Sequence, residues 1–153
     1  MTLFLKYLSV LGIAALPVFE LRGAVPYGVA MDLPLLSVLT VSVIGNMIPV
    51  PFIILFIRRI FDWMKTKSSR LRGIAEKLEA RAHAKSDMLV KYEMLGLFIL
   101  VAIPLPGTGA WTGSLVAALF NLRLKNALPP IFFGVVAAGL IMSVLSYGVD
   151  MLL

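Results

Sequence analysis

The sequence predicts an all-α integral membrane protein built as an inverted repeat, in which each half contains a re-entrant helical hairpin and one transmembrane helix. Three observations predict this fold class. The chain is 60% hydrophobic and only 14% charged, with a mean hydropathy of +0.98. The apolar residues gather in four long tracts, and proline and glycine break two of them. Most basic residues lie in one block between the second and third tracts, which predicts a cytoplasmic segment between the two halves.

Composition excludes several classes of protein. A soluble domain is about half apolar and about a quarter charged, and a chain of 153 residues is too small to bury this much apolar surface in water. The chain has no cysteine and a single histidine, His83, so disulfides, thiolate sites and two-histidine metal motifs are excluded. We expect no metal and no cofactor. The net charge of +6 is concentrated in the basic block, which does not favour nucleic acid as a partner.

The four tracts differ in length and continuity. A membrane-spanning helix needs about 20 apolar residues, and the second and fourth tracts meet that length. The second is predicted to be kinked or broken near "GNMIPVP", where Pro49 and Pro51 each remove a backbone donor. The first tract is short and ends at Pro17, and the third is interrupted by "IPLPGTG" at 103–109. Proline and glycine at this density end a regular helix. The predicted elements are therefore hairpins at 3–31 and 94–120 and transmembrane helices at 33–57 and 128–150.

The polar segment 58–93 separates the predicted membrane repeats 1–57 and 94–153. Helical spacing relates four apolar residues, Leu71, Ile74, Ala75 and Leu78, so 71–92 is predicted to be an amphipathic helix. The simplest interpretation is a helix in solvent or on the membrane surface, and the alternative is a contact with a partner or with lipid headgroups.

The distribution of charge favours hairpins over four complete crossings. With four crossings, the block 58–93 and the loop containing Arg123 and Lys125 would lie on opposite faces, against the positive-inside rule. Two hairpins place both on the cytoplasmic side. The tripeptides "ALP" at 15–17 and "AIP" at 102–104 occupy equivalent places in the two halves. The first tract carries Lys6 and lacks a small-residue cleavage site, so we expect no cleaved signal peptide.

The first break carries Glu20 and Arg22, in the stretch "FELRGAVPYGVA", and in an irregular turn both side chains can point into one cavity. Ionisable residues at membrane depth are costly, and they commonly mark a substrate or proton path. Burial favours the protonated form of a carboxyl group, which makes Glu20 the candidate proton carrier. Arg22 offers a planar donor group for phosphate or carboxylate, and half-helices starting near Gly23 or Gly109 would offer free N–H groups to anions. The candidate site residues are Glu20, Arg22, Gly23, Pro26, Asn46, Pro104, Pro106, Gly107, Thr108, Gly109, Trp111 and Thr112.

These residues also have simpler interpretations. The alternative for Glu20 and Arg22 is a loop at the outer surface after a short spanning helix. Trp111 is compatible with an interfacial anchor. Asn46 is either a hydrogen-bond partner of a hairpin tip or a contact between helices. The glycines of the third tract are compatible with close packing alone.

Two stretches carry a resemblance to a known family. They are "PVFELRGAVPYG" at 17–28 and "AIPLPGTGAWTGSLVAALF" at 102–120. With the basic middle segment, they resemble the small multidrug export proteins and, more distantly, the DedA-like membrane proteins. The resemblance implies a multi-pass protein of the bacterial or archaeal inner membrane with two opposed re-entrant hairpins. The DedA-like relatives imply proton-dependent handling of phospholipid or polyprenyl-phosphate carriers. The chain is shorter than most of these relatives and has a longer basic segment.

Together these features predict a small secondary transporter, coupled to protons, that moves an amphipathic or lipid-phosphate substrate among membrane lipids. Few helices surround any cavity in so short a chain, so we expect a homodimer or a larger homo-oligomer. One alternative is a lipid flippase or scramblase without proton coupling. Another is a membrane scaffold whose segment 58–93 binds a cytosolic partner. An enzyme is not expected, because no histidine or cysteine can pair with a nucleophile.

Overall fold

The computed structural model describes residues 2–84, 93–105 and 107–150, and these residues form helices and turns without any strand. The predicted all-helical fold is confirmed. In chain order the helices are α1 (Leu3–Ala15), α2 (Glu20–Ala30), α3 (Leu35–Met47), α4 (Pro49–Lys67), α5 (Ser69–Ala84), α7 (Glu93–Ala102), α8 (Ala110–Leu119) and α9 (Leu124–Asp150).

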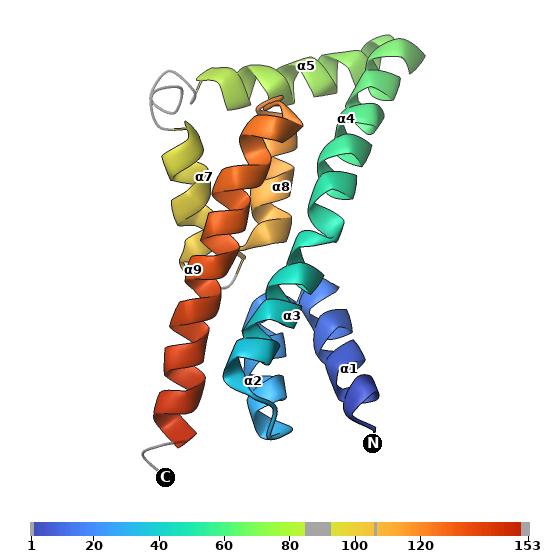
Figure 1. Cartoon of the computed structure of the whole chain (residues 1–153). Coiled ribbons are helices and arrows are strands. Elements are labelled where there is room, and N and C mark those ends of the chain that lie inside the picture. Colours follow the sequence, from blue (N-terminus) through green and yellow to red (C-terminus); the bar gives the residue numbers. More distant parts are fainter. Residues whose placement is uncertain (1, 85–92, 106, 151–153) are drawn as a thin grey trace.

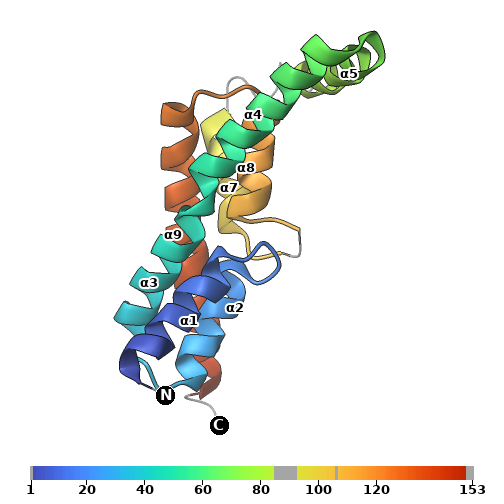
Figure 2. The same cartoon turned by 90° about the vertical axis from the view of Figure 1, so that its right-hand side faces the viewer.

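Four of the short helices form two hairpins (Figure 1). Helices α1 and α2 are joined by the first hairpin turn, residues 16–19, and α7 and α8 by the second hairpin turn, residues 103–109. The hairpins lie at opposite ends of the molecule, and their turns meet near its middle (Figures 1 and 2). Both α1 and α7 end just before the prolines that predicted the breaks, Pro17 and Pro104.

Long helices run beside both hairpins (Figure 1). Helices α3 and α4 follow one another with an interruption at Ile48, where the sequence predicted a break in the second tract. Pro49 and Pro51 lack an N–H, so the carbonyl groups of Gly45 and Met47 lose their helical hydrogen-bond partners. Helix α9 returns along the whole length of the molecule in the opposite direction.

Two stretches are long and apolar enough to cross a membrane: the 33 residues Leu35–Lys67 and the 25 residues Leu124–Gly148. Large apolar side chains on the outer surface fit the same environment. Phe4 on α1 is 73% exposed, Phe52 on α4 is 69% exposed, and Val144 on α9 is 73% exposed. Exposed apolar side chains on three helices suit lipid as the solvent.

Glycines bring the helices into close contact. A Cβ atom on Gly45 of α3 would lie 2.6 Å from the carbonyl oxygen of Leu11 and 2.9 Å from Cβ of Ala14, both on α1. A Cβ atom on Gly139 of α9 would lie 2.5 Å from Cδ1 of Leu39 on α3. Small residues at such places allow helix axes to approach closely in a membrane protein. Helix α3 is therefore packed between the first hairpin and α9.

A cation closes the open end of the first hairpin. Lys6, the charged residue inside α1, donates a hydrogen bond from Nζ to the carbonyl oxygen of Met31, 2.9 Å away. Met31 is the C-terminal cap of α2, where helical carbonyl groups lack backbone partners and favour positive charge. The position of Lys6 in an apolar helix thus has a structural explanation.

Helix α5 lies across the end of the molecule next to the second hairpin (Figure 1). It includes the first part of the amphipathic helix predicted at 71–92, and residues 85–92 lie outside the described residues. Of the predicted apolar face, Ala75 is fully buried and Ile74 is 50% exposed. On the exposed side, Arg72 and Glu76 form an ion pair of 2.8 Å one helical turn apart.

Candidate functional site between the hairpin turns

Glu20 joins the two hairpins. It is the first residue of α2 and is only 4% exposed, and its Oε1 atom accepts a hydrogen bond from the backbone N–H of Trp111 at 3.0 Å. The N–H of Ala110 also contributes to binding the carboxylate. Ala110 and Trp111 are the first two residues of α8, whose N–H groups have no partner within the helix. The carboxylate therefore caps α8 from a helix 91 residues away in the sequence, with the charge that a helix N-terminus favours.

Gly109 makes room for this carboxylate. It has φ of +122°, a region that side chains rarely adopt, and a Cβ atom on it would overlap the Glu20 carboxylate. Glu20 itself has φ of +48°, which is uncommon for a residue other than glycine. The contact therefore depends on unusual backbone conformations on both sides.

Arg22 binds the other end of the second hairpin turn. Its guanidinium group donates to the carbonyl oxygen of Leu105 and, at 3.4 Å, to that of Ile103, just after the end of α7. A third hydrogen bond, 2.6 Å long, goes to Oγ1 of Thr108. A cation at the C-terminal end of a helix is favoured by the helix dipole. The two charged residues of α2 thus bind the two helix ends of the second hairpin, each at the end that its charge suits.

Threonines stabilise the second turn from within. The hydroxyl of Thr108 lies 2.7 Å from the carbonyl oxygen of Ile103 and 2.8 Å from that of Leu105. Thr112 donates from Oγ1 to the carbonyl oxygen of Gly107 at 3.0 Å. Both hydroxyl groups therefore serve the conformation of the turn, in addition to the contact between Thr108 and Arg22.

Trp111 makes the reverse contact, from the second hairpin to the first. Its indole Nε1 donates to the carbonyl oxygen of Ala15 at 3.2 Å. Ala15 is the last residue of α1, as Ala102 is the last residue of α7. In each hairpin, a side chain from the beginning of the second arm binds a carbonyl group at or just after the end of the other hairpin's first arm. We call this set of reciprocal contacts the hairpin junction.

The remaining sequence candidates lie beside the junction or apart from it. Gly23 and Pro26 are part of α2, and Pro26 removes the helical hydrogen bond to the Arg22 carbonyl group. Pro104 and Gly107, with φ of +82°, shape the second turn. Pro106 lies outside the described residues.

Asn46 lies on α3, where its Oδ1 atom is buried without a hydrogen-bond partner in the described part of the chain. Ser42, one helical turn earlier, likewise has a buried Oγ without a partner among the described residues. The two side chains share one face of α3, which packs against the first hairpin and α9. No hydrogen bond in the described residues links Asn46 to either hairpin turn.

The structure differs from the sequence interpretation in one respect. Glu20 and Arg22 were expected in an irregular turn and facing one cavity. They lie instead in the first turn of α2, and their side chains reach opposite ends of the second hairpin turn. Their partners include backbone groups of Ala110, Leu105 and Ile103, which carry no sequence signature. The one sequence signal near the carboxylate of Glu20 is the glycine at 109, because glycine permits a positive φ.

The fold and the junction define an all-helical protein with two apolar helices of membrane-spanning length and two hairpins held together by charged side chains. A family model described as "Putative small multi-drug export protein" matches residues 20–141. Because the match covers most of the chain, the protein belongs to this family, as the sequence resemblance predicted. The family and the two apolar helices together indicate a membrane protein. Comparisons with curated proteins and with solved structures returned no match.

Proposed function

We propose that this protein is a small secondary transporter that exports amphipathic or anionic-headgroup substrates and is coupled to protons through Glu20. The single observation that carries the proposal is the buried Glu20 carboxylate, which connects the two hairpins at the N-terminus of α8. A buried acid at the contact between two moving parts is a suitable proton-sensitive element, because its charge determines the strength of that contact.

In this proposal the hairpins are re-entrant, enter the bilayer from opposite faces and form an inverted repeat with the helices that follow them. Lengths support this placement. The 13 residues of α1 and the 10 of α7 extend about 20 Å and about 15 Å, which together match a hydrocarbon core of about 30 Å. The hairpin junction then lies near mid-depth. Broken helices at equivalent places in inverted halves commonly form the substrate site of a transporter.

The proposed cycle uses the junction as a contact that opens. Ionised Glu20 holds the N-terminus of α8 through a charge-assisted hydrogen bond. A proton on the carboxylate removes the charge and weakens this bond, and the hairpins then move apart. Arg22 leaves the carbonyl groups of the second turn and binds the anionic part of the substrate through its planar donor group.

We place α5 and the basic segment 58–93 in the cytoplasm of a bacterial or archaeal cell, in agreement with the positive-inside rule. We also propose a homodimer or a larger homo-oligomer. A single copy offers few helices to surround a substrate path, and apolar side chains such as Phe133 and Leu145 of α9 remain exposed for contact with a second copy or with lipid.

The test is dye transport in proteoliposomes with an imposed pH gradient. A lipophilic fluorescent dye serves as the amphipathic probe, and Glu20→Gln is compared with Glu76→Gln, which removes the same charge on the exposed face of α5. We expect Glu20→Gln to abolish the dependence of transport on the gradient and Glu76→Gln to preserve it. Gradient-driven transport by Glu20→Gln at the wild-type rate would disprove the proton role.

The same proteoliposomes separate the alternatives. Dithionite quenching of a fluorescently labelled phospholipid reports movement of lipid between leaflets without a gradient. Lipid movement that is independent of pH would favour a scramblase over the proposed transporter. A scaffold predicts that replacing Glu20 or Arg22 has no effect in cells, whereas deleting 70–84 of α5 does.

A further inference from the structure

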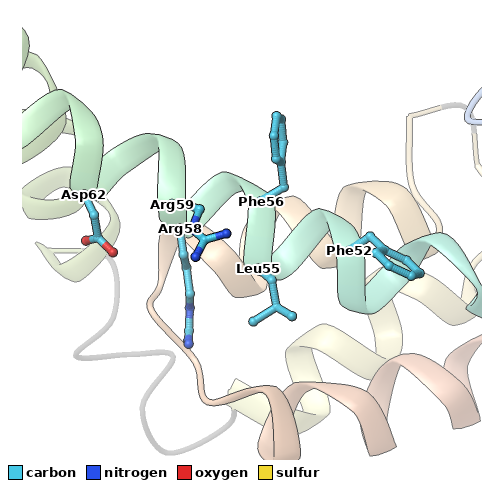
Figure 3. A pocket seen from close by; sticks show the side chains of 6 residues that line it. All are labelled: Phe52, Leu55, Phe56, Arg58, Arg59 and Asp62. Atoms are coloured by element: carbon cyan, nitrogen blue, oxygen red, sulfur yellow. The ribbon is translucent and has the colours of Figure 1, made fainter.

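The surface of α4 changes from apolar to basic within two helical turns. Phe52, Leu55 and Phe56 are 69%, 52% and 65% exposed, and Arg58 and Arg59 follow directly. Together with Asp62 they line a surface groove with a volume of about 490 Å³. Figure 3 shows the apolar side chains, the two arginines and Asp62 in this order along the helix.

A second, more polar pocket of about 300 Å³ lies on the side of α4 that faces the end of α8. It shares Arg58 and Asp62 with the groove, so the two spaces flank the same turn of α4. Its lining consists of Arg58, Phe61, Asp62, Lys65, Ala118 and Asn121.

Arg58 lies between the two spaces, and one of its N–H donors has no acceptor among the described residues. One Nη group donates to the carbonyl oxygen of Leu122 in the turn between α8 and α9. The Nε–H group is buried and has no acceptor in the described part of the chain. A buried charged donor without a partner is unfavourable, and an acceptor from a bound molecule would satisfy it. Arg59 is exposed beside it and has no hydrogen bond or ion pair to any described residue.

We infer that this groove and pocket bind an anionic phospholipid of the membrane. The phosphate group is bound by Arg58 and Arg59, the acyl chains lie along Phe52, Leu55 and Phe56, and the rest of the headgroup reaches toward the polar pocket. Guanidinium groups suit phosphate because they donate two parallel hydrogen bonds. The charged residues that line the two spaces are three bases and one acid: Arg58, Arg59, Lys65 and Asp62. Their net positive charge favours an anionic over a zwitterionic headgroup.

The surroundings favour lipid over a soluble anion. The groove is open to the apolar outer surface of α4 and not to an enclosed cavity. Trp63, 53% exposed, follows one turn after Arg59, and the Lys67 ammonium lies 5.7 Å from the centre of its ring. Tryptophan and lysine at the end of an apolar helix are typical of the membrane–water interface. This inference does not depend on transport, since the lipid is bound and not moved.

The test is native mass spectrometry of the intact protein, released from detergent with equal amounts of phosphatidylglycerol and phosphatidylcholine. We expect wild-type protein to retain phosphatidylglycerol preferentially. Arg59→Gln, which removes no contact within the described chain, should lower the ratio of the two adducts about fivefold. Arg58→Gln should lower it further. Arg70→Gln, an exposed residue of α5 with the same change of charge, is the matched control and should leave the ratio unchanged.

Two further measurements complete the test. Phe52→Ser should reduce adducts of both lipids, because it removes contact with the acyl chains and not with the phosphate. Inorganic phosphate or glycerol 3-phosphate should not displace phosphatidylglycerol. Equal retention of the two lipids by wild-type protein, an equal effect of Arg59→Gln and Arg70→Gln, or displacement by soluble phosphate would each overturn the inference.

Discussion

The carboxylate of Glu20 occupies the space that a side chain on Gly109 would need. The two residues belong to different hairpins, and neither position tolerates much change, because Glu20 is bound to the first N–H groups of α8 and Gly109 has φ of +122°. The hairpin junction therefore depends on a carboxylate in one half of the chain and on the absence of a side chain in the other half.

Replacing Gly109 with alanine tests this relationship. We expect Gly109→Ala to lower the free energy of unfolding by about 1–3 kcal/mol, from backbone strain and displacement of Glu20. The matched control is Gly12→Ala on α1, where a Cβ atom meets nothing within 4 Å. There alanine should stabilise the helix by about 0.5–1 kcal/mol. Thermal unfolding in detergent, followed by circular dichroism, measures both; equal effects of the two substitutions would contradict the contact.

The contact between Arg22 and Thr108 is suited to a double-mutant cycle. Arg22→Met and Thr108→Val together remove a charge-assisted hydrogen bond of 2.6 Å. We expect a coupling energy of about 1.5–3 kcal/mol, as for hydrogen bonds to charged groups. Unfolding in detergent with increasing sodium dodecyl sulfate gives the free energies.

The control cycle combines Arg22→Met with Thr66→Val. Thr66 is an exposed residue of α4 whose hydroxyl donates only to the nearby carbonyl group of Trp63. The two changes should be additive to within about 0.5 kcal/mol, because the sites share no partner. If both cycles are additive, the hydrogen bond between Arg22 and Thr108 does not stabilise the folded protein in detergent.

The reverse contact predicts an effect at Trp111. Trp111→Phe keeps an aromatic ring but removes the N–H group that donates to Ala15. We expect a loss of about 0.5–1.5 kcal/mol in unfolding free energy, the net value of a typical hydrogen bond. Trp63→Phe, at an exposed site on α4, should change it by less than about 0.5 kcal/mol. A larger loss of unfolding free energy for Trp63→Phe than for Trp111→Phe would contradict a stabilising role of the Trp111 hydrogen bond.

Much of the fold could be predicted from the sequence, because breaks in helices are local events. Proline and glycine near Pro17 and Pro104 ended α1 and α7 where the pattern indicated, and Pro49 and Pro51 marked the interruption between α3 and α4. Apolar length likewise indicated the two long helices. Each of these sequence features determines the structure of residues only a few positions away.

The geometry of the junction could not be predicted in the same way. The partners of Glu20 and Arg22 are mostly backbone groups about 80 to 90 residues away, such as the N–H of Trp111 and the carbonyl group of Leu105. Every residue has such groups, so no residue type marks them. Glu20 also begins α2 with φ of +48°, a value that is uncommon for a residue other than glycine and that its residue type does not indicate.

Labelling of single cysteines tests the proposed topology, since the chain has no cysteine of its own. Thr2→Cys and Ser69→Cys place thiols at exposed positions at the start of α1 and of α5. We expect a membrane-impermeant maleimide to label position 2 in intact cells and position 69 only after permeabilisation. Val18→Cys, in the first hairpin turn and 83% exposed in a single copy, should react slowly from either side. Rapid, complete labelling of position 18 from outside would place the first turn at the outer surface and exclude a re-entrant hairpin.

The buried polar pair on α3 allows function to be separated from stability. Oδ1 of Asn46 is buried and has no partner among the described residues, and leaving a buried polar atom unsatisfied is unfavourable. We expect Asn46→Leu, which is similar in volume, to unfold at the same or a higher temperature than wild-type protein. Ser42→Ala should behave alike for the same reason. If Asn46→Leu keeps its stability but loses gradient-driven dye transport, Asn46 acts in the transport cycle, where it meets substrate, water or a hairpin in another conformation. A loss of more than about 1 kcal/mol would instead show that Asn46 already has a hydrogen-bond partner in the resting protein.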